Sequence, residues 1–167
     1  MVQVTFKDNP IHLLGSEVKV GDQAPSFTVL ANDLNPVTLD DSKGKVRLIS
    51  VVPSVDTGVC SIQTKRFNDE ATSLGDDVEV MTISCDLPFA QGRWKENAKV
   101  ENLHLYSDHR DLSFGTAFGT AIEELRLLTR SIFVVDRDDK VTYVEYVSEA
   151  TDHPDYDAAI KAVKELN

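Results

Sequence analysis

The residues best suited to chemistry in this sequence are a proline, a threonine and a cysteine that stand close together. Pro53, Thr57 and Cys60 come directly after the apolar run Val46–Val52. That run has the composition of a buried strand, Pro53 ends it, and a helical pattern follows. Thr57 is a suitable N-cap residue, which places Cys60 three residues later in the first turn of the helix. A cysteine at that position lies near the positive end of the helix and near unpaired backbone N–H groups, conditions that favour a reactive thiolate.

A thiolate needs more stabilisation than the end of a helix can supply. A free thiol with a pKa of ~8.5 is only about 3% ionised at pH 7. Lowering that pKa to roughly 6 requires about 3.4 kcal/mol, whereas a helix end contributes ~0.3–1 kcal/mol. A hydrogen bond, which Thr57 can donate, and a nearby cation must supply the rest. Arg130 directly precedes an apolar strand and is the candidate cation, although a surface ion pair is the commoner role of an arginine.

The composition of the chain is that of an acidic globular protein. Its 167 residues, of which 41% are apolar and 27% charged, predict a single domain, residues 1–167, with a substantial core. The net charge of −11 disfavours binding to nucleic acid or to an anionic membrane. No segment approaches the length of a transmembrane helix, and the first residues lack the basic and apolar regions of a secretory signal. Two cysteines do not make a disulfide scaffold, so we expect a cytoplasmic protein with a functional thiol.

Apolar patterns and turn residues predict the elements that must hold Cys60 in place. An N-terminal β-hairpin is expected from residues 2–6 and 11–14. Further strands are expected at residues 26–31, 46–52, 78–84 and 103–107, and an antiparallel hairpin at 131–136 and 141–147. Helices are expected at residues 57–75, 91–99 and 155–166, with a helical turn at 111–119. This order predicts an α/β fold in which a sheet carries helices on both faces.

The residues around Cys60 resemble the active site of the peroxiredoxins. The segment Val52-Pro-Ser-Val-Asp-Thr-Gly-Val-Cys60 contains the pattern Pro-x-x-x-Thr-x-x-Cys of that family. Three other segments resemble its thiol peroxidase branch, the atypical two-cysteine peroxiredoxins: Ile83–Trp94, Ser107–Phe114 and Thr151–Ala159. The resemblance extends over essentially the whole chain.

The resemblance implies a thioredoxin-like fold, with a central mixed β-sheet flanked by helices, that reduces hydrogen peroxide and organic hydroperoxides. It implies that Cys60 is the peroxidatic cysteine, which attacks a peroxide oxygen and becomes a sulfenic acid. It also implies that Thr57 is the active-site threonine and that Pro53 shields the site from water. Arg130 matches the family's arginine and would stabilise the leaving oxygen. A homodimer and reduction by thioredoxin are implied as well. The sequence contains no metal, flavin or nicotinamide motif, so no cofactor is expected.

The second cysteine departs from the family pattern. Thiol peroxidases usually carry a resolving cysteine just after the segment Phe-Ala-Gln-x-Arg-Trp, and here Lys95 occupies that position. The remaining thiol, Cys85, is either a buried structural residue or a substitute resolving thiol for Cys60. Burial statistics favour the structural role, which entails a one-cysteine peroxidase served by an external thiol. The resolving role stays open because both cysteines follow strands at their carboxyl ends.

Other residues offer weaker alternatives. Asp56 and Asp86 are expected to be solvated loop carboxylates, whereas Phe89 and Trp94 are candidates for an apolar wall that contacts lipid-like hydroperoxides. A Cys–His hydrolase is disfavoured because no oxyanion-loop motif is present. A redox sensor or binding module that oxidises Cys60 once, without repeated turnover, is the alternative function. Ordinary surface or core roles are expected for the histidines, which lack a metal-ligand spacing: His12, His104, His109 and His153.

Overall fold

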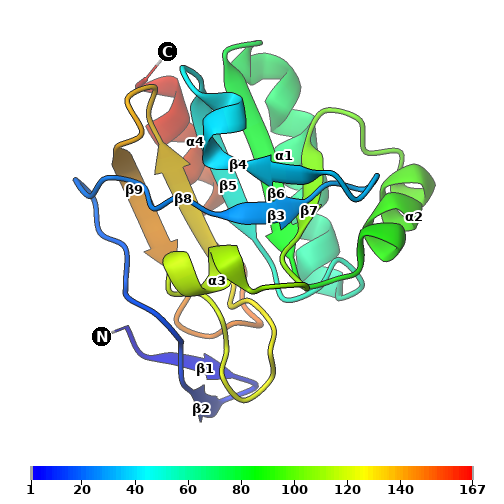
Figure 1. The fold of residues 1–167 in the computed structure, drawn as a ribbon, viewed down its shortest axis with the longest axis vertical. Helices are drawn as coiled ribbons and strands as arrows, with labels where there is room; N and C mark the ends of the chain where they lie inside the picture. Colours follow the sequence, from blue (N-terminus) through cyan, green and yellow to red (C-terminus); the bar gives the residue numbers. More distant parts are fainter. Residues whose placement is uncertain (1, 167) are drawn as a thin grey trace.

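The computed structural model describes residues 2–166 and shows a mixed β-sheet with helices on both faces (Figure 1). Seven strands form the sheet in the order β4-β3-β7-β6-β5-β8-β9, and β1 and β2 form a separate hairpin. The strands are β1 Val4–Phe6, β2 Asn9–Ile11, β3 Thr28–Leu30, β4 Pro36–Thr38, β5 Val46–Val51, β6 Val78–Ser84, β7 His104–Ser107, β8 Ser131–Val135 and β9 Val141–Tyr146. The helices are η1 Leu39–Ser42 (a 3₁₀ helix), α1 Gly58–Leu74, α2 Pro88–Ala98, α3 Ser113–Ala117 and α4 Tyr156–Lys164. The expected α/β sheet, flanked by helices and preceded by a hairpin, is confirmed.

The central strand β5 fixes the position of the helix that carries Cys60. All six residues of β5 are buried, between the parallel strand β6 and the antiparallel strand β8. A strand covered on both faces is expected to be mostly apolar, as four of the six residues of β5 are; the other two, Arg47 and Ser50, are also buried. Helix α1 begins a few residues later with Thr57 at its N-cap, in extended conformation. Cys60 therefore lies in the first turn of α1, at the carboxyl end of the sheet's central strand.

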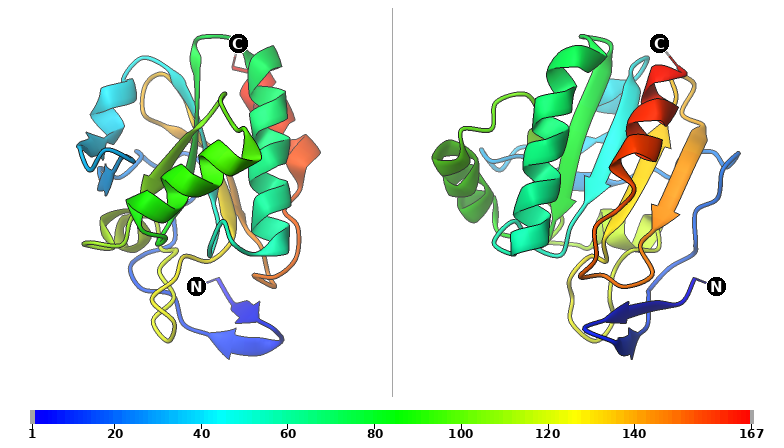
Figure 2. Two further views of the ribbon diagram at one scale, coloured as in Figure 1. Left: turned by 90° about the vertical axis from the view of Figure 1, so that its right-hand side faces the viewer. Right: turned by 180° about the vertical axis from the view of Figure 1, so that it is seen from behind.

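Each face of the sheet has its own apolar core. On one face α1 and α4 lie side by side, as Figure 2 shows, and the core beneath them includes Cys60 and Phe67. On the other face α3 contributes to a core dominated by aromatic rings. Four of these rings pack edge to face or stacked, with centroids 4.5 to 6.3 Å apart: Phe27, Phe114, Phe118 and Phe133. The sheet thus separates two distinct packing environments.

The N-terminal hairpin is tightly turned and lies at the carboxyl end of β5. Its two-residue turn consists of Lys7 and Asp8, both with positive φ (51° and 66°), as a type I′ turn requires. The second strand occupies residues 9–11 rather than the expected 11–14. Thr5 bridges to Glu149, so the N-terminal hairpin lies against the loop between β9 and α4 (Figure 1).

Several short elements differ from the sequence prediction. Strand β4 and the 3₁₀ helix η1 were not expected, because three or four residues carry no measurable periodicity. Helix α2 begins at Pro88 rather than Gln91, since proline is well accommodated at the first helical position. Helix α3 has five residues, fewer than the expected span of 111–119.

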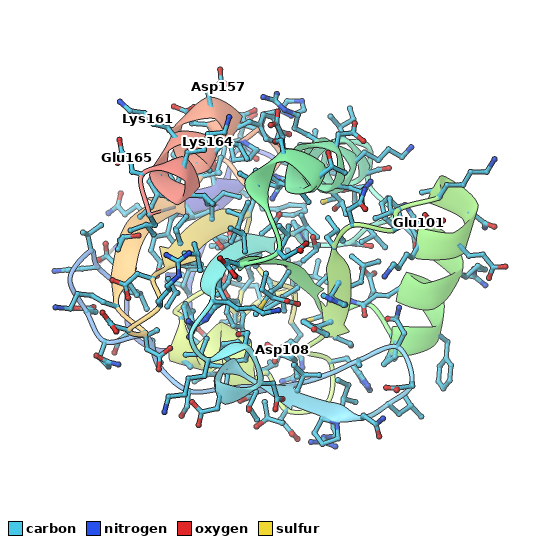
Figure 3. All side chains as sticks on the ribbon, turned by 90° about the horizontal axis from the view of Figure 1, so that it is seen from above. Glu101, Asp108, Asp157, Lys161, Lys164 and Glu165 are labelled. Carbon is cyan, nitrogen blue, oxygen red and sulfur yellow. The ribbon has the colours of Figure 1, made fainter. Side chains whose placement is uncertain are left out.

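The final helix has the amphipathic character expected of it. Ala159, Ile160 and Val163 are buried against the sheet, and Asp155 caps the helix by accepting a hydrogen bond from the Ala158 N–H (3.0 Å). The opposite side is charged, as Figure 3 shows for Asp157, Lys161, Lys164 and Glu165. Within residues 2–166, no helix has the length and apolar character needed to cross a membrane.

Candidate active site

The sulfur of Cys60 is buried and lies beside a guanidinium group. Cys60 has no exposed surface, and Nη2 of Arg130 lies 3.2 Å from its Sγ. Arg130 is itself only 2% exposed, and a guanidinium keeps its charge at any accessible pH. The first-turn N–H groups of α1 also lack intrahelical acceptors. Charges interact more strongly away from bulk water, so the guanidinium of Arg130 acts strongly on the sulfur beside it.

Two further hydrogen bonds fix the orientation of the Arg130 guanidinium. Its Nη1 donates to Oε1 of Gln63, and its Nε donates to the carbonyl of Ala150, both at 2.9 Å. Gln63 is in turn held by a hydrogen bond from its Nε2 to Oγ of Ser50 (2.7 Å). Gln63 was missed in the sequence. It lies three residues after Cys60 and is fully buried; the available signal was a glutamine at helical spacing from Cys60, on the expected apolar face.

Pro53 and Thr57 frame the entrance to α1 in different ways. Pro53 is buried, whereas Thr57 is exposed. The Thr57 hydroxyl donates a hydrogen bond to the carbonyl of Ser54 (3.2 Å) and does not cap the helix. The structure therefore places Thr57 at the expected N-cap position without the expected hydrogen bond to the Cys60 sulfur.

Asp86 anchors the loop that precedes Cys60, and the expectation of a solvated carboxylate was wrong. Its Oδ1 accepts a hydrogen bond from the Ser54 hydroxyl (2.7 Å). Its Oδ2 accepts from the Val55 N–H (2.9 Å) and from the Ser84 hydroxyl (2.7 Å). Asp86 follows β6, so this carboxylate ties the loop between β5 and α1 to the neighbouring strand. Asp56, by contrast, is exposed as expected.

A cavity of about 390 Å³ opens next to Arg130 and brings the predicted site residues together. Pro53, Thr57 and Arg130 all line it, and Cys60 lies directly behind the guanidinium. Its remaining walls come from the start of α1, from the N-terminal hairpin and from the loop after β9: Gly58, Val59, Phe6, Lys7, Ala150 and Thr151. The volume is within the range of small-molecule sites in proteins. The arrangement suits a small ligand with a polar head that faces the guanidinium.

Phe89 and Trp94 do not form a wall of this cavity, so that expectation was wrong. Phe89 is 68% exposed near the start of α2. Trp94 lines a different cavity of about 280 Å³, shared with Asp56 and Lys65.

Cys85 occupies a chemically different environment on the other face of the sheet. It is partly exposed and packs against the aromatic core, whereas Cys60 belongs to the core under α1 and α4. Burial, together with the carboxylates of Asp108 and Asp86, raises the pKa of the Cys85 thiol to about 12 against the opposing charge of Arg126. Cys85 is therefore a neutral thiol at physiological pH. Both cysteines are free in this structure.

The position of the usual resolving cysteine lies in helix α2. Lys95 is half-buried in the last turn of α2. Its carbonyl accepts the N–H groups of Lys99 and Val100, which ends the helix. The backbone at this position is thus helical and well bonded.

Three of the histidines have hydrogen-bonding partners on the surface. The imidazoles of His12 and His104 lie 3.1 Å from Glu124 and Glu79. Nδ1 of His153 lies 2.7 Å from the Tyr156 hydroxyl. His12, Glu123 and Glu124 form an exposed group whose ligand-type atoms lie within 4.8 Å of one another.

The chain resembles bacterial thiol peroxidases along its whole length. Residues 19–160 match the Redoxin family. The chain is 70% identical over 164 residues to a thiol peroxidase of Halalkalibacterium halodurans, with 98% of each chain covered. It is 60% identical over 166 residues to a thiol peroxidase of Bacillus subtilis, with 99% of each covered.

Solved structures show the same architecture. A peroxiredoxin-like protein from Aquifex aeolicus superposes with a TM-score of 0.93 at 38% identity, over 100% of this chain and 98% of the other. A thiol peroxidase from Chromobacterium violaceum superposes with a TM-score of 0.86 at 23% identity, over 98% and 96%. The expected thioredoxin-like fold, with its mixed sheet and N-terminal hairpin, is confirmed by these superpositions.

Proposed function

The chain belongs to the thiol peroxidases of the redoxin family, and from that premise we propose that Cys60 is its peroxidatic cysteine, acting on hydrogen peroxide and organic hydroperoxides. Membership makes the protein a thiol-dependent peroxidase. The observation that supports the assignment of the cysteine is the 3.2 Å contact between Cys60 Sγ and Arg130 Nη2.

The reaction begins with attack by the Cys60 thiolate on the terminal peroxide oxygen. An S–O bond forms, the O–O bond breaks, and the sulfur is oxidised to a sulfenic acid. The second oxygen leaves with the bonding electrons and takes up a proton to become water or an alcohol. Arg130 Nη2 faces this developing negative charge, and Gln63 keeps the guanidinium in that orientation. The Thr57 hydroxyl, which lines the same cavity, is placed to contact the peroxide after a change of rotamer.

Attack also requires the sulfur to become accessible. Cys60 has no exposed surface, whereas Asp56, Thr57 and Gly58 in front of it are exposed. A small outward movement of this entrance to α1 opens a path from the cavity to Sγ. Pro53 stays buried behind the loop and limits the entry of water.

We propose that an external thiol resolves the sulfenic acid. Lys95 replaces the usual resolving cysteine, and Cys85 packs on the other face of the sheet as a neutral thiol. A thiol reductant then condenses with the sulfenic acid to give a mixed disulfide and water. A second thiol of the reductant releases Cys60 as a thiol and leaves the reductant as a disulfide. Thioredoxin, the reductant implied by the resemblance, has the dithiol that this sequence needs.

We further propose that the protein is a cytoplasmic homodimer. Two free cysteines suit a reducing compartment. Large apolar side chains are exposed on α1 and at the start of α2, at Ile62 (54%), Leu87 (53%) and Phe89 (68%). An apolar surface of this kind suits a protein interface. Sedimentation of the purified protein at several concentrations tests the dimer, and a monomer at every concentration would contradict it.

Peroxide consumption with a dithiol reductant tests the proposed activity. The protein should consume many equivalents of hydrogen peroxide in the presence of dithiothreitol. After one equivalent of peroxide without reductant, mass spectrometry should find sulfenic acid on Cys60 and an unmodified Cys85. Consumption of one equivalent only would instead indicate the redox-sensor alternative. A Cys60–Cys85 disulfide would overturn the one-cysteine mechanism.

A further inference from the structure

The turn of the N-terminal hairpin forms the outer wall of the cavity at Arg130. Phe6 and Lys7 line the cavity from the hairpin, opposite Pro53 and Val59. The cavity therefore combines apolar lining with two cations, the buried guanidinium of Arg130 and the exposed lysine Lys7. The peroxidase chemistry uses Arg130 and leaves the hairpin wall without an assigned role.

The hairpin is held in register with the loop that orients Arg130. The Thr5 N–H donates to the carbonyl of Ser148 (2.9 Å), and the Ala150 N–H donates to the carbonyl of Thr5 (2.8 Å). The carbonyl of Ala150 in turn accepts the hydrogen bond from Arg130 Nε. A short chain of hydrogen bonds thus connects the hairpin strand to the guanidinium.

Glu149 strengthens this connection. Its Oε1 accepts hydrogen bonds from the Thr5 hydroxyl (2.8 Å) and from the Asp8 N–H (2.7 Å). Its Oε2 accepts from the N–H (2.7 Å) and the hydroxyl of Thr151. Burial, which raises the pKa of Glu149, is outweighed by these hydrogen bonds, which lower it to about 2. The Glu149 carboxylate therefore stays ionised at neutral pH and keeps the turn at Lys7 in place.

The charge of Lys7 is available to a ligand. In the structure of residues 2–166, Lys7 has no ion-pair partner, and no aspartate or glutamate lines the cavity. Arg130, the other cation of the cavity, is engaged with Cys60, Gln63 and Ala150. The protein as a whole carries a net charge of −11 and repels anions. Both charged side chains that line the cavity are thus cations, although the carboxylates of Asp8 and Glu149 lie close to Lys7 outside the lining.

On the premise that Cys60 reduces hydroperoxides as proposed, we propose that Phe6 and Lys7 select organic hydroperoxides that carry a carboxylate. The hydroperoxide group faces Arg130 and Cys60, the apolar body contacts Phe6, and the carboxylate faces the Lys7 ammonium group. The carboxylate takes no part in the redox step. The sulfur gains the terminal oxygen, the O–O bond breaks, and the remaining alkoxide is protonated to an alcohol that keeps its carboxylate.

A matched pair of hydroperoxides tests the role of Lys7. The probes are cumene hydroperoxide carrying a para-carboxylate and the methyl ester of the same compound. The measured quantity is the ratio of kcat/KM for the acid to kcat/KM for the ester, with dithiothreitol as reductant. Lys7→Gln should lower this ratio about twofold to fivefold, as expected for a partly exposed charge pair. Added salt screens the repulsion by the net negative charge in both proteins, so the difference in ratio between the wild-type protein and Lys7→Gln, which reports the Lys7 charge, should shrink as salt is added.

Lys43→Gln is the matched control. It makes the same change in net charge at an exposed lysine just before the amino end of β5, the opposite end of the strand from Cys60. Its ratio should equal that of the wild-type protein. If the ratio fell equally in Lys7→Gln and Lys43→Gln, the change in net charge would explain the effect. That result would overturn the proposal for Lys7.

Phe6→Ala tests the apolar part separately. It should lower kcat/KM for both organic probes about threefold to tenfold relative to hydrogen peroxide, because an apolar contact is lost. Unchanged values for Lys7→Gln and Phe6→Ala would overturn the proposed selection while the peroxidase activity stands. Absence of turnover with every hydroperoxide in the wild-type protein would instead overturn the proposed function itself.

Discussion

The two cysteines lie at the same end of neighbouring strands, yet the groups around them carry opposite charge. Strands β5 and β6 run parallel with Val51 opposite Ile83, and each is followed closely by a cysteine. Cys60, on one face of the sheet, contacts the guanidinium of Arg130. Cys85, on the other face, lies near the carboxylates of Asp86 and Asp108, which add to its raised pKa.

This comparison shows that exposure is a poor guide to a reactive thiol. Cys85 is partly exposed and Cys60 has no exposed surface, so a search by accessibility would select Cys85. The nucleophile in peroxide reduction is the thiolate, however, and its stability depends on the charges and donors around the sulfur. A guanidinium lies beside the sulfur at Cys60, whereas burial above all, and two carboxylates in addition, raise the pKa of the Cys85 thiol.

Replacing each cysteine by serine should give the largest contrast. Cys60→Ser removes the sulfur that faces Arg130, so hydrogen peroxide consumption should fall to the rate of a protein-free control. Cys85→Ser should keep the wild-type turnover, because the proposed mechanism resolves the sulfenic acid with an external thiol. The measurement is steady-state peroxide consumption with dithiothreitol. Loss of turnover in a folded Cys85→Ser protein would instead assign the resolving role to Cys85.

Replacing Arg130 should greatly lower the rate at which hydrogen peroxide oxidises Cys60. Arg130→Met deletes the donor 3.2 Å from the sulfur, and the rate of Cys60 oxidation should fall about 10²- to 10³-fold. Stopped-flow measurement of the second-order rate constant with hydrogen peroxide checks this expectation.

Arg130→Lys provides the control for charge alone. It keeps a cation but loses the fork that also binds Gln63 and Ala150. Its rate should lie between those of the wild-type protein and Arg130→Met. Circular dichroism must show a folded protein in each case, and an unchanged rate in folded Arg130→Met would remove this residue from the chemistry.

Weakening the anchor at Asp86 should have a smaller effect on the reaction. Asp86→Asn removes one acceptor and turns an amide toward the donors of Ser54 and Val55. The loop that carries Pro53 and Thr57 is then less well fixed, and turnover should fall about tenfold, equivalent to ~1.4 kcal/mol. Steady-state peroxide consumption measures this change.

Asp56→Asn is the matched control for the anchor. It makes the same charge change at an exposed side chain of the loop that Asp86 anchors, and its turnover should be close to the wild-type value. An equal loss in both variants would show that the charge of the loop matters rather than the hydrogen bonds of Asp86.

The contrast between the two sites was only partly predictable from the sequence. The position of Cys60 was predictable because it depends on local signals, an apolar strand, a proline and an N-cap residue. The same holds for α4, whose apolar side chains recur with helical spacing. Gln63 could have been found, since its distance from Cys60 along α1 places both on the buried face.

The remaining features depend on contacts between distant parts of the chain. Arg130 and Cys60 are separated by 70 residues, and Glu149 and Thr5 by 144. Asp86 looked like an ordinary loop carboxylate because its partners Ser54 and Val55 belong to a different loop. Hydrophobic periodicity describes one element at a time and therefore cannot report which loops meet at the end of a sheet.

The smallest expected effect concerns the charge near Cys85. Asp108 is 2% exposed, and burial raises its pKa to about 6 against the hydrogen bonds from the Phe114 and Gly115 N–H groups. At pH 9 Asp108 is therefore ionised and opposes the Cys85 thiolate. Below the Cys85 pKa of about 12, the thiolate fraction rises tenfold with each pH unit, and lowering that pKa raises the fraction at a fixed pH. Asp108→Asn should thus speed alkylation of Cys85 by iodoacetamide at pH 9 about threefold to tenfold.

The measurement is made in the Cys60→Ser background, so that Cys85 is the thiol that reacts. Asp111→Asn, which alters an exposed carboxylate in the same loop, should leave the rate unchanged. Burial is the largest cause of the raised Cys85 pKa. In Asp108→Asn, iodoacetamide should therefore still alkylate Cys85 more slowly than it alkylates an exposed cysteine at the same pH. A rate that does not respond to Asp108→Asn would show that burial alone suppresses Cys85. The two cysteines would then differ by a cation at one site rather than by opposite charges at both.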